Sequence, residues 1–134
     1  MAEDNKNFEL KIITPDRTFY EGQASMVEFN TTEGQLGIFK NHIPITVVIK
    51  PGVLTIKGEE VLTAALHSGF AEILQDSITI LAEVIEWPNE IDESRAEAAR
   101  ERAQKRIDEH SAQTDVARAE AALSRAMTRI NVLK

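Results

Sequence analysis

Six arginines in the last third of the chain recur at matching spacings of seven and four residues. They occupy the same places in two thirteen-residue segments, 95–107 and 118–130, which share nine identical residues at an offset of 23. These spacings keep each trio on one face of a helix, where guanidinium groups can bind phosphate oxygens in a bidentate manner. The alternative is a solvated helix face on which glutamates neutralise the arginines. The six are Arg95, Arg102, Arg106, Arg118, Arg125 and Arg129.

The segment that carries the arginines has the composition of helix. From Asn89 onward there is no glycine or proline, and alanine, arginine and glutamate dominate. We expect an antiparallel hairpin of helices over about 90–109 and 114–133, with a turn at 110–113 and Asn89 as the first N-cap. Asp92 would lie favourably at the positive end of the helix dipole.

The apolar seam of this hairpin is thin. Because alanine buries little area, we expect the hairpin to close conditionally, and an anion such as a polyphosphate would relieve repulsion between arginines of the two helices. The expected seam residues are Ala96, Ala99, Ala103 and Ile107 in the first helix, and Val116, Ala119, Leu123, Ala126, Met127 and Ile130 in the second.

Residues 1–87 have a different pattern, with short apolar runs separated by glycine, proline and aspartate turns. Many short antiparallel strands predict a β-sandwich or barrel. The sequence therefore predicts an α+β fold in two domains, a sandwich over 1–87 and a two-helix hairpin over 88–134. The clearest strand runs are Phe8–Ile12, Ala24–Phe29, Ile45–Ile49, Val53–Ile56, Val61–Leu66, Phe70–Leu74 and Ile78–Ile85.

Charge and composition exclude several classes of protein. The net charge of −7 lies entirely in residues 1–87, and it disfavours a general nucleic-acid binder. The absence of cysteine excludes disulfides, iron–sulfur clusters and thiol nucleophiles. No apolar run approaches the roughly 18 residues of a membrane span, so we expect a soluble, cytoplasmic chain.

Two further features could suggest chemistry, and the sequence favours structural roles for both. The segment Gly34–Gly37 lacks the Lys-Ser/Thr ending of a phosphate loop and a following helix, which favours tight-turn glycines. His42 and His67 have no partners with which to complete a catalytic set, so we expect structural or surface histidines. An independent enzyme therefore has no supporting constellation.

Three segments together form a highly specific pattern: Phe8–Asp16 continuing to Tyr20–Gly22, Glu33–Pro44 and Ser68–Glu72. Through these segments the sequence resembles, over nearly its whole length, the epsilon subunit of bacterial F-type ATP synthases. The resemblance implies a ten-stranded sandwich followed by two helices, in a non-catalytic rotor subunit at the cytoplasmic side of the bacterial membrane. It also implies that the sandwich contacts the gamma subunit and the c-subunit ring. The helices either fold against the sandwich or extend into the catalytic head and inhibit ATP hydrolysis.

Some members of this family bind ATP through a pattern written Ile/Leu-Asp-x-x-Arg-Ala, which is complete here at Ile91–Ala96. The resemblance implies a regulatory ATP, with or without Mg²⁺, whose phosphates meet four arginines. Asp92 and the backbone of Ile91 would meet the adenine edge, and Glu86 would accept from a ribose hydroxyl. Glu93, in place of a more usual apolar residue, adds a negative charge nearby. The implied ATP-site residues are Glu86, Ile91, Asp92, Arg95, Ala96, Arg102, Arg125 and Arg129.

Extension of the helices would use some of the same arginines differently. The resemblance implies that Arg118, Arg125 and Arg129 then meet acidic side chains of the alpha and beta subunits. A free-standing adenine-nucleotide sensor, with the sandwich as scaffold, is the alternative function, and co-purification with a membrane-bound ATPase separates the two.

Overall fold

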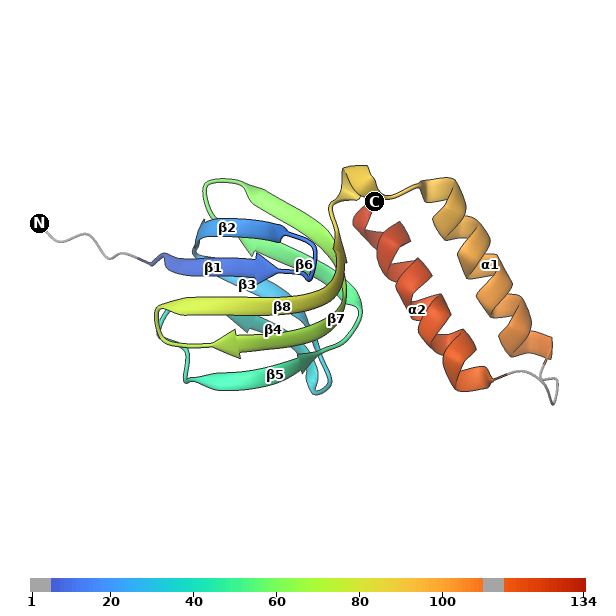
Figure 1. Ribbon diagram of the computed structural model, residues 1–134, viewed down its shortest axis with the longest axis horizontal. Helices are drawn as coiled ribbons and strands as arrows, with labels where there is room; N and C mark the ends of the chain where they lie inside the picture. The colour runs from blue at the N-terminus through green and yellow to red at the C-terminus, as the bar shows by residue number, and fades with distance from the viewer. Residues whose placement is uncertain (1–5, 110–114) are drawn as a thin grey trace, which may run out of the picture.

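The computed structural model describes residues 6–109 and 115–134, and it places a β-sandwich at one end and a helical hairpin at the other (Figure 1). Helix α2 lies between the sandwich and α1 in this arrangement. The strands are β1 (Phe8–Ile13), β2 (Thr18–Ala24), β3 (Met26–Thr31), β4 (Gly34–Ile38), β5 (Ile45–Ile49), β6 (Gly52–Lys57), β7 (Val61–Ile73) and β8 (Ser77–Glu86). The 3₁₀ turn η1 (Pro88–Glu90) and the helices α1 (Glu93–Glu109) and α2 (Val116–Val132) follow.

The strands form one hydrogen-bonded sheet that folds over its own core. The order is β2-β1-β8-β7-β5-β3-β4, while β6 pairs with both β3 and β7. Alternate side chains point inward, as the period of two along each strand requires. The enclosed core includes Leu10, Phe29, Leu54, Leu66 and Ile80, all at most 1% exposed. The predicted β-sandwich is confirmed.

The described chain has eight strands, two fewer than the resemblance implied, and β7 is a single long strand. The sequence predicted two strands, Val61–Leu66 and Phe70–Leu74, where β7 is continuous. Its register against β8 shifts around Ser68, and β7 changes partner from β6 to β5 beyond this point. Gly69 has φ +144°, and a Cβ there would collide with the Leu81 carbonyl oxygen. The glycine therefore permits a bulge, not a turn.

The seam between the two helices is made of alanine at equivalent places of the repeat. Ala96 and Ala103 in α1 and Ala119 and Ala126 in α2 are all buried. Helix α2 also contacts β6 and β7 of the sandwich, and its residues Thr128, Ile130 and Val132 are buried as well. The expectation that Met127 belongs to the seam is wrong, since that side chain is 37% exposed. Helix α1 packs chiefly on α2, so it forms the outer layer of the hairpin (Figure 1).

Both helices begin later than expected. Residues 88–90 form the separate turn η1, Ile91 is extended, and Asp92 caps α1 by accepting from the Arg95 backbone N–H at 3.2 Å. Asn89 is therefore not the N-cap. Asp115 caps α2 by accepting from the Arg118 N–H at 3.1 Å. The expected turn at 110–113 and the residue Thr114 lie outside the described residues.

The linker between the domains is fastened to the sandwich. The Trp87 ring stacks on the Phe19 ring with centroids 4.1 Å apart, and the Arg17 guanidinium lies over the Phe19 ring. The Glu90 carboxylate closes η1 by accepting from the Trp87 backbone N–H at 2.9 Å and from Arg17 at 2.8 Å. These contacts interrupt any helix before Ile91 and explain why α1 starts at Glu93.

A fragment of residues 1–90 should therefore fold alone as an all-β unit. It keeps the sandwich core together with Trp87 and Glu90, so we expect a cooperative thermal melt by circular dichroism. In that fragment Trp87→Ala should lose about 0.5–1.5 kcal/mol of aromatic pairing besides buried area, which lowers the melting temperature by several degrees. A fragment that is unfolded by circular dichroism would show that the sandwich depends on the hairpin.

Candidate functional site

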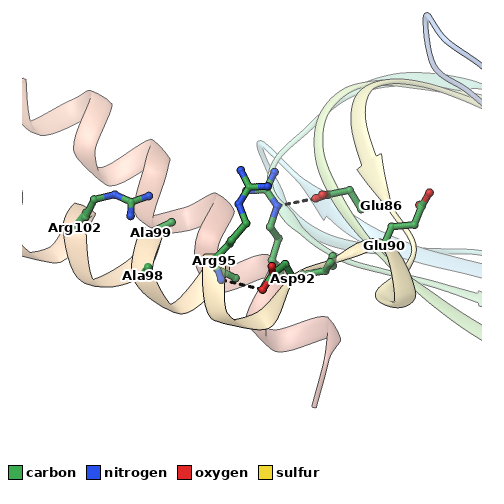
Figure 2. A pocket seen from close by; sticks show the side chains of 10 residues that line it. Glu86, Glu90, Asp92, Arg95, Ala98, Ala99 and Arg102 are labelled. Carbon is green, nitrogen blue, oxygen red and sulfur yellow. Dashed lines mark hydrogen bonds and ion pairs between the residues drawn. The ribbon is translucent and has the colours of Figure 1, made fainter.

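A pocket of about 430 Å³ lies where the linker, the start of α1 and the end of α2 meet the last residue of β8 (Figure 2). Its volume falls within the roughly 300–1,000 Å³ of small-molecule sites. Seven of the eight residues expected at an ATP site line it. The lining consists of Glu86, Glu90, Ile91, Asp92, Arg95, Ala96, Ala98, Ala99, Arg102 and Arg129.

The antiparallel hairpin explains which arginines meet at this pocket. The first half of α1 lies beside the last half of α2, so Arg95 and Arg102 approach Arg129. Equivalent places of the repeat are thus not equivalent in space. Arg106 and Arg118 belong to the opposite ends of their helices and do not line the pocket. The eighth expected residue, Arg125, is exposed one turn before Arg129 and also lies outside the lining.

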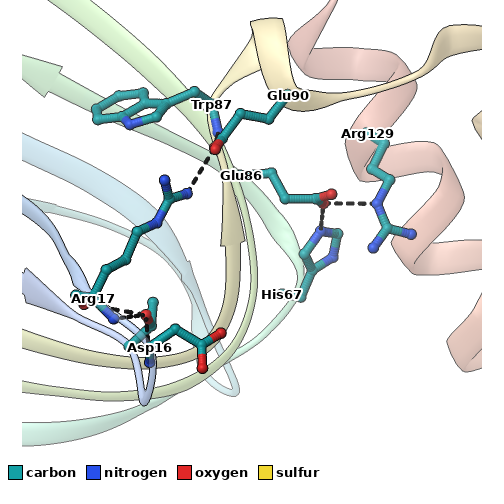
Figure 3. Close-up of polar contacts among 8 residues, drawn as sticks. Asp16, Arg17, His67, Glu86, Trp87, Glu90 and Arg129 are labelled. Atoms are coloured by element: carbon teal, nitrogen blue, oxygen red, sulfur yellow. Dashed lines mark hydrogen bonds and ion pairs between the residues drawn. The ribbon is translucent and has the colours of Figure 1, made fainter.

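The arginines at the pocket retain unused donors. Within residues 6–109 and 115–134, the side chains of Arg95 and Arg102 form no ion pair. Arg129 donates from Nε to Glu86 Oε1 at 2.7 Å, which leaves its two terminal nitrogens for other acceptors. Figure 3 shows this bond between Arg129 and Glu86. Three guanidinium groups with available N–H donors make the pocket suited to a polyanion.

Two of the three lining carboxylates are committed to local structure. Asp92 caps α1, and the preceding Ile91 has an extended backbone. Glu90 is bound by Arg17, and this hydrogen bond, helped by the Trp87 N–H, lowers the pKa of the Glu90 carboxyl (Figure 3). Glu93, whose charge was expected near the site, does not line the pocket.

The third carboxylate, Glu86, has a partner that sequence reasoning did not find. His67 Nε2 lies 3.0 Å from the Glu86 oxygen that also accepts from Arg129 (Figure 3). The His67 ring is 2% exposed, and burial lowers its pKa, with the hydrogen bond to Glu86 acting in the opposite direction. The structural role expected of His67 holds, but its partner is nineteen residues away and left no local signal. His42 lies in the β4–β5 loop, where its Nδ1 is 2.8 Å from the Ile43 carbonyl oxygen.

The arrangement suits binding of a charged ligand. No group of three or more potential metal ligands occurs in the part of the chain that the structure describes. No helix in the described ranges is long and apolar enough to cross a membrane. The segment Gly34–Gly37 lies within β4, and the turn itself is formed by Thr32 and Glu33. Gly34 has φ +117° directly after this turn, whereas Gly37 lies inside the strand, so the turn role expected of Gly37 is wrong.

A β-sandwich followed by a two-helix hairpin, with a pocket between them, defines a two-domain class of protein. The delta/epsilon chain β-sandwich domain of ATP synthase matches residues 7–88, and its long α-helix domain matches residues 89–134. The chain belongs to the ATP synthase delta/epsilon chain family.

Relatives and solved structures agree with this assignment. The ATP synthase epsilon chain of Brevibacillus brevis is 47% identical over 93% of this chain and 96% of its own length. That of Caldanaerobacter subterraneus is 45% identical over 77% of this chain and 76% of its own. A chain of the Euglena gracilis mitochondrial ATP synthase has the same fold, with a TM-score of 0.85 at 18% identity, over 99% of this chain and 85% of that chain.

The capping role of Asp92 yields a prediction that needs no ligand. Asp92→Ala should destabilise the first turn of α1 by about 0.5–2 kcal/mol, because an orphan N–H loses its acceptor. Hydrogen exchange at Arg95 and Ala96 would measure the loss. Asp92→Ser restores a capping oxygen and should restore protection from hydrogen exchange. Equal loss of protection in both variants would show that the Asp92 side chain does not stabilise the start of α1.

Proposed function

We propose that this chain is a non-catalytic central-stalk subunit of an F-type ATP synthase, which couples rotation to catalysis and restrains ATP hydrolysis. Family membership over both domains supports the assignment. Two structural neighbours are chains of mitochondrial ATP synthases, one in an OSCP/F1/c-ring assembly of Euglena gracilis and one in the central stalk and c-ring of Tetrahymena thermophila. In this proposal the chain lies at the cytoplasmic side of the bacterial membrane, held there only through the complex.

The regulatory ligand in this proposal is ATP, bound in the pocket beside α1. The observation that carries it is the convergence of three arginines, a capped helix start and Glu86 on one hollow of suitable volume. Arg95, Arg102 and Arg129 neutralise the phosphates, with Mg²⁺ sharing that role if it accompanies the nucleotide. Asp92 and the Ile91 backbone meet the adenine edge, and Glu86 accepts from the ribose. Arg125 approaches phosphates that extend past the pocket rim.

The sandwich would supply the contacts to the gamma subunit and the c-subunit ring. An apolar row crosses three neighbouring strands, because Val48 pairs with Phe70 and Phe70 with Leu81, and all three are at least 45% exposed. Phe39 and Ile43 in the β4–β5 loop are also exposed, at 64% and 78%. Contiguous exposed apolar side chains are characteristic of protein-contact surfaces.

Inhibition requires the helices to leave the sandwich. Arg118 and Arg125 are already exposed and would meet acidic side chains of the alpha and beta subunits. Arg129 joins them only after its bond to Glu86 breaks. The closed and extended states therefore compete for this arginine, and a ligand of the closed state lowers the extended population.

Arg102→Ala should weaken ATP binding to the isolated chain by about 1.5–3 kcal/mol, the range for hydrogen bonds to charged groups. Arg100→Ala is the matched control, since Arg100 pairs with Glu97 at 3.1 Å and lies outside the pocket. Isothermal titration calorimetry would measure both. Equal losses would mean that the arginines act only through general charge, as a solvated helix face.

Deleting residues 89–134 should raise ATP hydrolysis by the assembled enzyme, most strongly at low ATP concentration. High ATP holds the hairpin closed in the intact chain, so the two enzymes should converge as ATP increases. Initial hydrolysis rates across ATP concentrations would measure this effect. Unchanged rates at every concentration would reassign the hairpin to assembly or stability.

A further inference from the structure

His67 lies where the sandwich meets α2, in the irregular stretch of β7. Its Nε2 is 3.0 Å from Glu86 Oε1, the oxygen that also accepts from Arg129 Nε. Since an ionised carboxylate can only accept hydrogen bonds, His67 Nε2 must carry a hydrogen. One carboxylate oxygen thus joins a buried strand residue to the last turns of α2 (Figure 3).

The second ring nitrogen of His67 has no comparable partner. Nδ1 is buried and makes no hydrogen bond within the described chain. A proton on Nδ1 would create a buried, unpaired N–H donor on a positively charged ring, and both features are costly. The closed hairpin therefore favours the neutral form of His67.

Charged groups around the ring come mainly from α2. Burial is the largest cause that lowers the His67 pKa, and Arg129 and Arg125 lower it further, while Glu86 from β8 opposes them. On the other edge of β7, Lys57 of β6 pairs with Val61, six residues from His67 and about 20 Å along the strand. Lys50, directly after β5, has an exposed side chain. Departure of α2 would remove both arginines and uncover the ring.

We propose that His67 is a positioning residue of the nucleotide site, which holds Glu86 toward Arg129 while neutral and takes up one proton when α2 leaves. The proposal rests on the proposed function in that the closed hairpin is taken as the ATP-binding state. Because the open form has the higher His67 pKa, closure is fully favourable above the ordinary value of about 6.5 and weakens as pH falls below it. Uptake of one proton lowers the equilibrium constant for closure of the hairpin by at most tenfold for each pH unit.

Calorimetric titration of the full chain with ATP, from about pH 5.5 to 8, tests this coupling. The terminal phosphate of ATP takes up a proton near pH 6 by analogy with phosphoryl groups. The quantity to compare is therefore the difference in the pH dependence of ATP affinity between the native chain and its variants. Below pH 6.5 the native chain should lose affinity more steeply than His67→Gln, whose amide can still donate to Glu86. His42→Gln, at an exposed loop, should follow the native chain. Identical slopes for the native chain and His67→Gln would overturn the proposal.

A second measurement needs no nucleotide. The chain has no cysteine, so Thr32→Cys and Ala117→Cys introduce one unique pair of spin labels on exposed positions of the sandwich and α2. Acidification should increase the separated population in the native background and not with His67→Gln. A pH-dependent separation without ATP binding at any pH would refute the ATP site alone. ATP binding with a pH-independent separation would refute the role of His67 alone.

The native chain provides a test if His67→Gln fails to fold. Linkage is reciprocal, so saturating ATP should shift protonation of the His67 ring to lower pH. Nuclear magnetic resonance of the imidazole signals in the full chain, with and without ATP, would measure the shift. A His67 titration that ATP leaves unchanged would overturn the proposal.

Discussion

The closed arrangement depends on the hydrogen bond between Arg129 and Glu86. At 2.7 Å, with the two side chains 28% and 25% exposed, it is shielded more than an ordinary surface ion pair. Among the described residues, it is the side-chain hydrogen bond that ties α2 to the sandwich. The pocket is lined by residues of both domains, and this bond joins two of them, Glu86 of β8 and Arg129 of α2.

The packing around that bond includes many small side chains. Alanines of α1 and α2 are buried at equivalent places of the repeat, and α2 contacts β6 and β7 of the sandwich. A ligand present at 100 times its dissociation constant adds about 2.7 kcal/mol to the state that binds it. In the proposed function, a nucleotide bound beside α1 would add a contribution of this size to the stability of the closed hairpin.

Sequence patterns predicted the features that depend on local periodicity. The alternating strands, the helical composition after Asn89 and the recurring arginines each follow from side chains a few residues apart. The continuous β7 and the contact of His67 with Glu86 depend on residues that are far apart in the sequence and meet only in the folded structure. The bulge at Gly69 shows the difference, because the same glycine that indicates a turn also permits close approach to Leu81. Family similarity, not periodicity, identified Glu86 as a site residue.

The attachment of the linker determines how the hairpin could move. Trp87 and Glu90 are held to the sandwich by Phe19 and Arg17, so a change of direction would fall on Ile91 and Asp92, which lie between η1 and α1. Beyond this hinge, the 17 residues of α1 form a rigid rod of about 26 Å. A small rotation of the backbone at Ile91 and Asp92, which line the pocket, would therefore move the C-terminal end of α1 through a large distance.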